Sequence, residues 1–271
     1  MRLVRWRLAL TAVVAAVLVL PTTVPTAAES GTRTRTAPIV ADFTSGAGTS
    51  YMNVSVTRQG NLSFESPSGE GLAFDGYGLC KLDQVQEYTA YAYNLPLEGV
   101  DQADVGFGPI SITQPNRGAF PVTIVRKTLD GTIRLSQTVA VPDPTDKEVT
   151  ITMTVRNIGT LPLSGLRLMR SANGHSQHGE SFFRAAETAD SVFQWWDEDA
   201  NGTANGVVMS ARTVGQPHEA GMPSDIDLGL YCGGYSDMNP YDNEGPAQIV
   251  YFLPRLAPGA EVTRAFLYHR L

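Results

Sequence analysis

Residues 120–168 alternate between apolar and polar side chains over several short runs. The apolar positions recur at every second residue, which is the period of a half-buried β-strand. They are Val122, Ile124, Ile133, Leu135, Val149, Ile151, Met153, Val155, Leu166 and Leu168. The opposite positions carry mainly Thr, Arg, Gln and Lys, so each strand has one face to bury. The pattern predicts antiparallel strands whose apolar faces pack against a second sheet.

The segments between these runs have the chemistry of turns. Asp130-Gly131 tolerates the positive φ that a tight hairpin requires. Residues 142–146 contain two prolines, which cannot donate to a ladder, and residues 157–162 are again rich in turn formers. No stretch shows a sustained helical period with caps. We therefore predict an all-β protein that forms an antiparallel β-sandwich, with the larger supersandwich as a variant of the same architecture.

The first 28 residues have the form of a secretory signal. Three arginines precede an apolar run over residues 8–20, and residues 26–28 are small, as at a cleavage site. The alternative is a membrane anchor, but the apolar run is short for a span and no later stretch matches it. Residues 29–37 lack an apolar period and are predicted to be a disordered lead-in. The prediction is a secreted protein with one β-sandwich domain over residues 38–271, without a membrane span in the mature chain.

The acidic balance of the chain limits its partners. The 20 basic and 27 acidic residues give a formal charge of −7. Removal of residues 1–28 takes away three arginines and no acidic residue, so the charge becomes −10. Such a charge disfavours nucleic acid and anionic lipid as partners. Only three of the basic residues are lysines, which is typical of a bacterium with a GC-rich genome.

The two cysteines, Cys80 and Cys232, both lie after the predicted signal. Export would place them in an oxidising environment, where a disulfide persists. The alternative is two separate thiols. We predict a Cys80–Cys232 disulfide, which would tie down the loop-rich stretch around Cys232.

Several strand and turn patterns resemble a known superfamily. They are Asp130-Gly131, residues 155–159, residues 166–170 and residues 256–259, which together span the C-terminal half of the chain. They resemble the β-supersandwich proteins of the galactose mutarotase-like superfamily. This resemblance implies carbohydrate-binding or carbohydrate-active sites. The superfamily's sugar epimerases have a His near the end of the strand that follows the Asn-x-Gly turn, whereas here that strand ends in Met169-Arg170-Ser171. The resemblance therefore assigns no catalytic residue to this chain.

A polar segment after the central strands contains His175, His178 and Glu180. On a loop, these three side chains could serve as acid, base or metal ligand. The alternative is a solvated polar loop. The chain has no Gly-x-Ser-x-Gly, His-Glu-x-x-His or phosphate-binding glycine motif that would select a reaction.

A second candidate site joins aromatic and acidic residues. Trp195 and Trp196 end a short predicted strand, so one of them would enter the core and the other would offer a platform for a sugar, unless both are buried. Asp197, Asp199 and Asn201 follow with the alternating oxygen side chains that begin an EF-hand loop. The twelfth position is Val208, which excludes an EF-hand. What remains is a calcium site on a β-loop, or an ordinary Asp/Asn/Gly turn.

Two functions from different classes remain. The first is a non-catalytic protein that binds a carbohydrate or cell-surface ligand through the tryptophans and the acidic loop. The second is a carbohydrate-active enzyme (a hydrolase, lyase or epimerase) that uses His175, His178 and Glu180. The absence of a recognisable catalytic set favours the first. Catalysis itself is left open.

Overall fold

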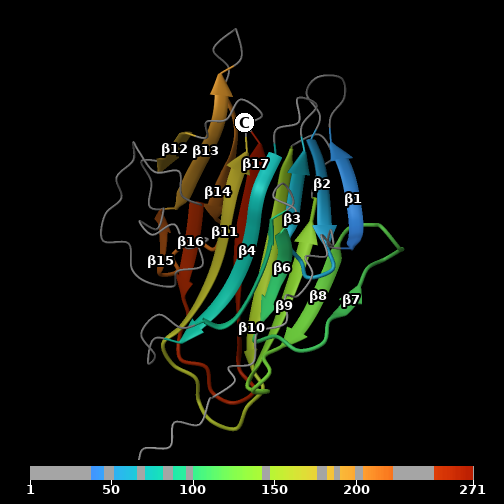
Figure 1. Cartoon of the computed structure of the whole chain (residues 1–271). Helices are drawn as coiled ribbons and strands as arrows, with labels where there is room; N and C mark the ends of the chain where they lie inside the picture. Colours follow the sequence, from blue (N-terminus) through green and yellow to red (C-terminus); the bar gives the residue numbers. More distant parts are fainter. Residues whose placement is uncertain are drawn as a thin grey trace, which may run out of the picture. The chain divides into compact units, whose positions relative to one another are not determined.

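Every regular element in the described part of the chain is a β-strand. The computed structural model describes residues 38–45, 52–65, 71–81, 88–95, 100–141, 147–175, 182–185, 190–198, 204–221 and 247–270. All of them belong to the compact unit over residues 33–271. Two antiparallel sheets pack face to face (Figure 1), and the predicted all-β sandwich is confirmed. Within the described residues, no helix is long and apolar enough to cross a membrane.

The first sheet has eight strands and contains the segment with the clearest alternation. Its order is β12-β13-β14-β17-β10-β9-β8-β7. The bounds are β7 (Ser111–Thr113), β8 (Val122–Lys127), β9 (Ile133–Ala140), β10 (Glu148–Asn157), β12 (Phe182–Ala185), β13 (Ser191–Glu198), β14 (Ala204–Ala211) and β17 (Glu261–Arg270). In β9 and β10 every second residue is buried, as the sequence predicts. The hairpin between β8 and β9 turns at Gly131, whose φ is 69°.

The second sheet has nine strands and a branch. Its main order is β1-β2-β3-β4-β11-β16-β15, and β5 pairs with both β4 and β6. The bounds are β1 (Ile39–Ser45), β2 (Met52–Thr57), β3 (Leu62–Glu65), β4 (Gly71–Lys81), β5 (Tyr88–Leu95), β6 (Val100–Val105), β11 (Leu166–His175), β15 (His218–Gly221) and β16 (Ala247–Phe252). One edge of β4 meets β3 only at Gly71 and meets β5 from Asp75 onwards. The turn between β2 and β3 therefore lies where this edge changes partner.

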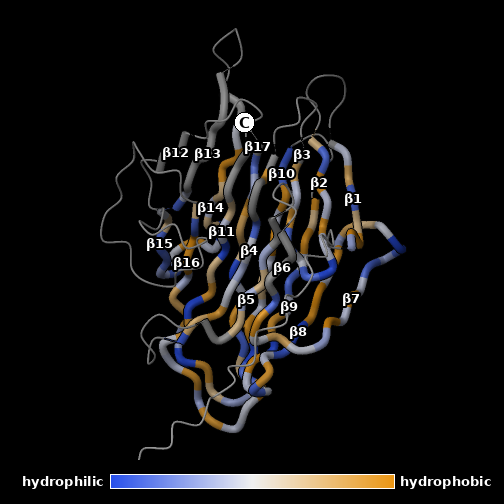
Figure 2. Tube along the Cα trace, in the orientation of Figure 1, coloured by the Kyte–Doolittle hydropathy of each residue, from blue (hydrophilic) through white to orange (hydrophobic). Residues whose placement is uncertain are grey.

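The hydrophobic core lies between the two sheets. It takes alternate residues from both, such as Leu79 and Leu168 from the nine-stranded sheet and Ile151 and Phe266 from the eight-stranded sheet, all of them fully buried. Hydrophobic and hydrophilic positions alternate along many strands (Figure 2). The middle strands of the nine-stranded sheet differ, because consecutive residues of β4, β11 and β16 are buried. These strands are covered on both faces.

The strand directions bring several chain segments to one end of the sandwich. β11 and β13 run in the same direction and both point to the top of Figure 1. β4, β14 and β16 run the opposite way, so they begin where β11 and β13 end. The connections from β11 to β12, from β13 to β14 and from β15 to β16 therefore leave from the same end. We call it the upper end.

Candidate functional site

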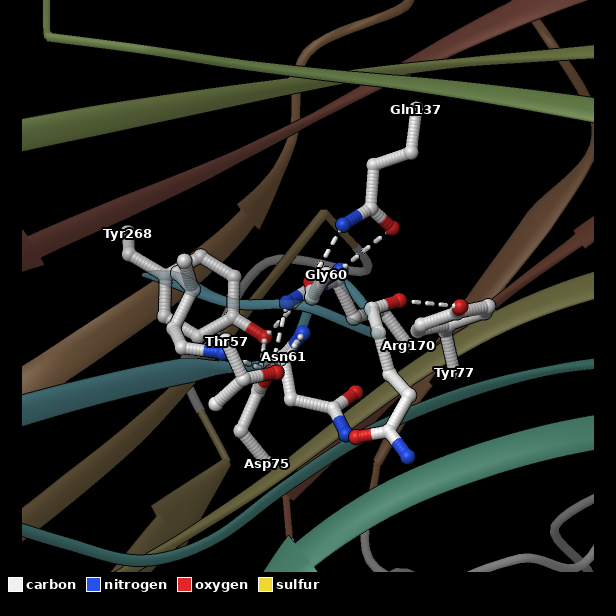
Figure 3. Close-up of polar contacts among 10 residues, drawn as sticks. Thr57, Gly60, Asn61, Asp75, Tyr77, Gln137, Arg170 and Tyr268 are labelled. Atoms are coloured by element: carbon white, nitrogen blue, oxygen red, sulfur yellow. Dashed lines mark hydrogen bonds and ion pairs between the residues drawn. The ribbon is translucent and has the colours of Figure 1, made fainter. Parts of the chain in front are cut away.

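An ion pair lies in the middle of the core. The Arg170 side chain on β11 donates through Nη2 to Asp75 Oδ2 on β4 at 2.6 Å, and both side chains are fully buried. Arg170 Nε donates to the Tyr268 hydroxyl at 2.9 Å, and that hydroxyl donates to Asp75 Oδ1 at 2.8 Å. Tyr268 comes from β17 of the other sheet (Figure 3). The three side chains therefore join the two sheets.

The same cluster satisfies the backbone at the branch of the nine-stranded sheet. The Leu62 N–H donates to Asp75 Oδ2 at 2.6 Å, and the Tyr77 hydroxyl donates to the carbonyl of Gln59. Gln137 on β9 donates to the Gly60 carbonyl and accepts from Arg170 at 3.0 Å (Figure 3). A buried backbone group without a partner is costly. The cluster supplies these partners where the β2–β3 turn enters the core.

A second buried arginine extends the cluster towards β6. Arg126 on β8 is 2% exposed and donates through Nη2 to both carboxylate oxygens of Asp104, at 2.6 and 2.7 Å. Its Nη1 donates to the Tyr77 hydroxyl at 3.3 Å, and its guanidinium lies 4.4 Å from the Phe107 ring centre. Tyr77 thus connects the two arginines. Each of them crosses from one sheet to the other.

Burial sets the protonation properties of the cluster. Burial raises the pKa of Asp75 to about 6, although Arg170 and the hydrogen bonds to Asp75 act in the opposite direction. Burial also raises the pKa of Tyr77 and Tyr268. Burial alone would lower the pKa of Arg170, but the Asp75 charge together with Tyr268 and Tyr77 acts in the opposite direction, and the pKa is raised. Because Asp75, Tyr77, Arg170 and Tyr268 are at most 1% exposed, no ligand reaches them in this structure, and their role here is to hold the sheets together.

The outer face of the nine-stranded sheet has a different composition. Ala90 and Ala92 of β5 point into the core, so Tyr91 and Tyr93 point outwards. Both tyrosines are partly exposed, and their rings are nearly parallel, 8° apart with centres separated by 6.0 Å. Their partners on β4 are glycines, since Tyr91 pairs with Gly78 and Tyr93 with Gly76. We call these four residues the tyrosine–glycine face.

This face continues across β11 and β16. Gly78 pairs with Met169, and Gly76 pairs with Ser171. Ser171 in turn pairs with Gln248 of β16, whose amide nitrogen lies 2.6 Å from Met169 Sδ. Met169, Ser171 and Gln248 are all fully buried. The partly exposed portion of the face is therefore at β5 and β6.

The residues predicted from the sequence lie at the upper end as far as the structure describes them. His175 is the last residue of β11, and Trp195, Trp196 and Asp197 lie near the end of β13. The pairing of β13 with β14 shifts at Trp196, so the regular alternation on which the prediction for the tryptophans rests is interrupted there. Four further predicted residues lie outside the described part of the chain: His178, Glu180, Asp199 and Asn201.

Cys80 is buried in β4, on the same side of the strand as Gly78. The described residues include no free cysteine. Cys232 lies outside the described residues, so its pairing with Cys80 stays a prediction. The segments 1–28 and 29–37 also lie outside them.

Comparisons with known proteins assign no family to this chain. No family model matches it, and no curated protein matches it. Among solved structures, it is similar to heparan sulfate lyase HepC from Pedobacter heparinus, with a TM-score of 0.48 and 8% sequence identity. The similarity covers 86% of this chain and 35% of the lyase, so the chain spans about a third of the length of that protein.

Proposed function

We propose that this protein is exported and binds a carbohydrate or another cell-surface ligand without transforming it. The observation that carries this proposal is the common upper end of β11 and β13. His175 and the tryptophan–acidic segment after Ser191 are separate in the sequence, but their strands lie against each other across the sandwich. Binding sites commonly lie on loops that a rigid scaffold positions, and this end provides such a scaffold. The secretory form of residues 1–28 supports an extracellular ligand.

The resemblance to the galactose mutarotase-like superfamily supports a sugar as the ligand, and membership in that superfamily is part of this proposal. The chemistry of the described residues favours binding over catalysis. The Asp75–Arg170 pair is closed to solvent, so this acid and its partner cannot exchange protons with a substrate. A catalytic role would fall to His175, His178 and Glu180.

A polysaccharide panel tests the proposal. Mature protein is applied to immobilised neutral and acidic polysaccharides, and both retention and released sugars are measured. We expect retention without product release. Product release that is lost in the His175→Ala or His178→Ala variant would identify an enzyme instead. Absence of retention and of release on every polysaccharide would reject a carbohydrate as the ligand.

We also propose that Asp197, Asp199 and Asn201 bind calcium weakly at the upper end. The described residues contain no group of three or more His, Cys, Asp or Glu side chains that could hold a metal ion. The proposal rests on the alternating oxygen side chains and on export, because extracellular calcium sites are filled even at dissociation constants of about 10⁻⁴ to 10⁻³ M.

Addition of millimolar calcium to chelated protein is expected to raise the melting temperature by a few degrees through mass action. It should also change tryptophan emission, because Trp195 and Trp196 are the only tryptophans beyond residue 28. An Asp197→Ala, Asp199→Ala variant is the matched control and should show neither effect. Identical responses of the variant and the parent protein would leave these residues as an ordinary turn.

A further inference from the structure

We infer that a row of cations on the outer face of the eight-stranded sheet binds an acidic polysaccharide. This inference rests on the proposed function and names a surface and a class of sugar for it. The row consists of Lys127 at the end of β8, Arg134 near the start of β9 and Arg156 near the end of β10. We call these three residues the cation row. It lies at the opposite end of the sheet from the end of β13, because β13 and β17 run in the same direction and β17 begins beside Arg156.

The ladders between the strands place the three cations side by side. Lys127 pairs with Arg134, and Arg134 pairs with Arg156. In each of the three strands the adjacent residue is buried, so the charged side chains point outwards. Neighbouring strands are about 4.8 Å apart, so the row extends over about 10 Å. One ligand molecule can therefore contact all three cations.

The cation row is open to solvent. Lys127 is exposed, Arg134 is partly exposed, and the Arg156 side chain is 41% exposed. Glu261 and Thr263, which lie next to Arg156 on β17, are exposed as well. This end of the outer face is therefore accessible to a ligand.

The three positive charges are poorly compensated. Among the described residues, neither Lys127 nor Arg134 forms an ion pair, and Arg156 approaches Glu261 only to 4.0 Å. Asp130 in the adjacent hairpin already pairs with a lysine on β4. Like charges directly opposite each other on paired strands destabilise a sheet. The cation row therefore disfavours folding in the absence of a ligand, and an anionic chain that lies along it would relieve the repulsion.

The residues around the cation row favour a polysaccharide over other polyanions. The next two rows of the same face consist mainly of small hydroxyl side chains: Ser136, Thr154 and Thr263, followed by Thr123, Thr138 and Thr152. Two pairs of these hydroxyls are hydrogen-bonded to each other at 2.9 Å, and each pair retains an O–H that can bond to a sugar hydroxyl. Arginine binds carboxylates strongly through parallel hydrogen bonds. A single-stranded nucleic acid would need aromatic side chains for its bases, and these rows contain none.

The net charge of the protein does not prevent this binding. The formal charge is −7, but exposed charges are screened over about 8–10 Å at physiological ionic strength. The cation row therefore determines the interaction with groups that are in contact with it. Because these contacts join exposed charges, the affinity should fall as salt is added.

Biolayer interferometry of the mature protein on immobilised polymers tests this inference. The probes are the polyuronates polygalacturonate and alginate, the neutral polysaccharides β-glucan and xylan, and single-stranded DNA. We expect at least one polyuronate to bind more tightly than the neutral polysaccharides and the DNA. This binding should be lost at about 1 M salt, where charges are screened over about 3 Å.

Three variants test the cation row itself. Arg134→Thr should weaken binding about 10-fold. Its melting temperature without ligand should not fall, because the variant removes a like charge from both neighbours. Glu261→Gln removes the carboxylate beside Arg156 and should strengthen binding about 2- to 5-fold, a gain that a damaged fold cannot produce. Arg117→Thr is the matched control, because it removes an exposed arginine before the start of β8 and should bind within about 2-fold of the parent.

The outcomes separate this inference from the proposed function. Unchanged binding of the polyuronates by folded Arg134→Thr, an equal loss in Arg117→Thr, or weaker binding by Glu261→Gln would overturn the inference. Equally tight binding of single-stranded DNA would also overturn it, because it would show a general affinity for polyanions. Binding of the neutral polysaccharides alone overturns the inference and leaves the proposed function standing. Absence of binding to every polysaccharide overturns the inference and rejects a carbohydrate as the ligand.

Discussion

Replacement of Arg170 by methionine is expected to lower the free energy of unfolding by about 3–5 kcal/mol at neutral pH. The reason is that Asp75 would lose its only ion-pair partner among the described residues while it remains fully buried. Tyr268 and Gln137 would also lose hydrogen bonds, and Gln137 connects Arg170 to the β2–β3 turn. Urea-induced unfolding, followed by fluorescence, measures the change.

Arg156→Met is the matched control. Arg156 and Glu261 are on paired strands and their charged atoms are 4.0 Å apart, but the side chains are 41% and 53% exposed. An exposed pair of this kind contributes less than about 1 kcal/mol. The double variant Asp75→Asn, Arg170→Met should recover part of the loss, because it removes both charges. Equal effects of Arg170→Met and Arg156→Met would show that the buried pair does not hold the sheets together.

The alternation of apolar residues was sufficient to predict the strands from β8 to β11 and the two-sheet architecture. The buried cluster was missed, although the sequence contains a signal for it. Arg126 follows Val122 and Ile124, Gln137 follows Ile133 and Leu135, and Arg170 follows Leu166 and Leu168. In each case the polar residue occupies the next core-facing position. At such a position the alternation favours a buried side chain, whereas the polarity of the residue favours solvent. Burial of the polar side chain can be predicted only when its partner on another strand is known.

The partners could not be predicted because they are distant in the sequence. Asp75 and Arg170 are brought together by the pairing of β4 with β11, and Tyr268 comes from the other sheet. Nothing in a local pattern specifies which strands pair over such separations. The branch at β4 cannot be predicted from a local sequence pattern either, because one edge of β4 pairs first with β3 and then with β5.

The candidate sites show the same limit. Tyr91 and Tyr93 were recognisable as residues of a strand, but their position opposite Gly78 and Gly76 follows only from the pairing of β5 with β4. Similarly, the sequence gives no reason to expect that the segments after β11 and β13 leave from one end. That arrangement depends on the directions of β11 and β13, which follow from the ladders within each sheet and from the way the two sheets pack on each other (Figure 1).

The pH dependence of the free energy of unfolding is expected to show the raised pKa of Asp75. The pKa of Asp75 is about 6 in the folded protein, above its ordinary value of 3.8. Between these two values the folded state holds a proton that the unfolded state has released, so stability from this group is greatest below about pH 4 and is lost as the pH rises through about 6. A difference of about 2 between the two pKa values corresponds to about 3 kcal/mol.

Asp75→Asn isolates this contribution from those of the other carboxyl groups. The amide cannot titrate, and its Oδ1 can still accept a hydrogen bond near Arg170. We expect the free energy of unfolding of the parent protein, minus that of the variant, to fall by about 3 kcal/mol between pH 4 and pH 7. The unfolding of both proteins in urea at half-unit pH intervals gives this difference. A difference that rises with pH would mean that the Arg170 charge outweighs burial and that the pKa of Asp75 lies below 3.8 in the folded state. In that case the cluster would be a permanently ionised pair, and its stabilisation would be lost in acid instead of above pH 6.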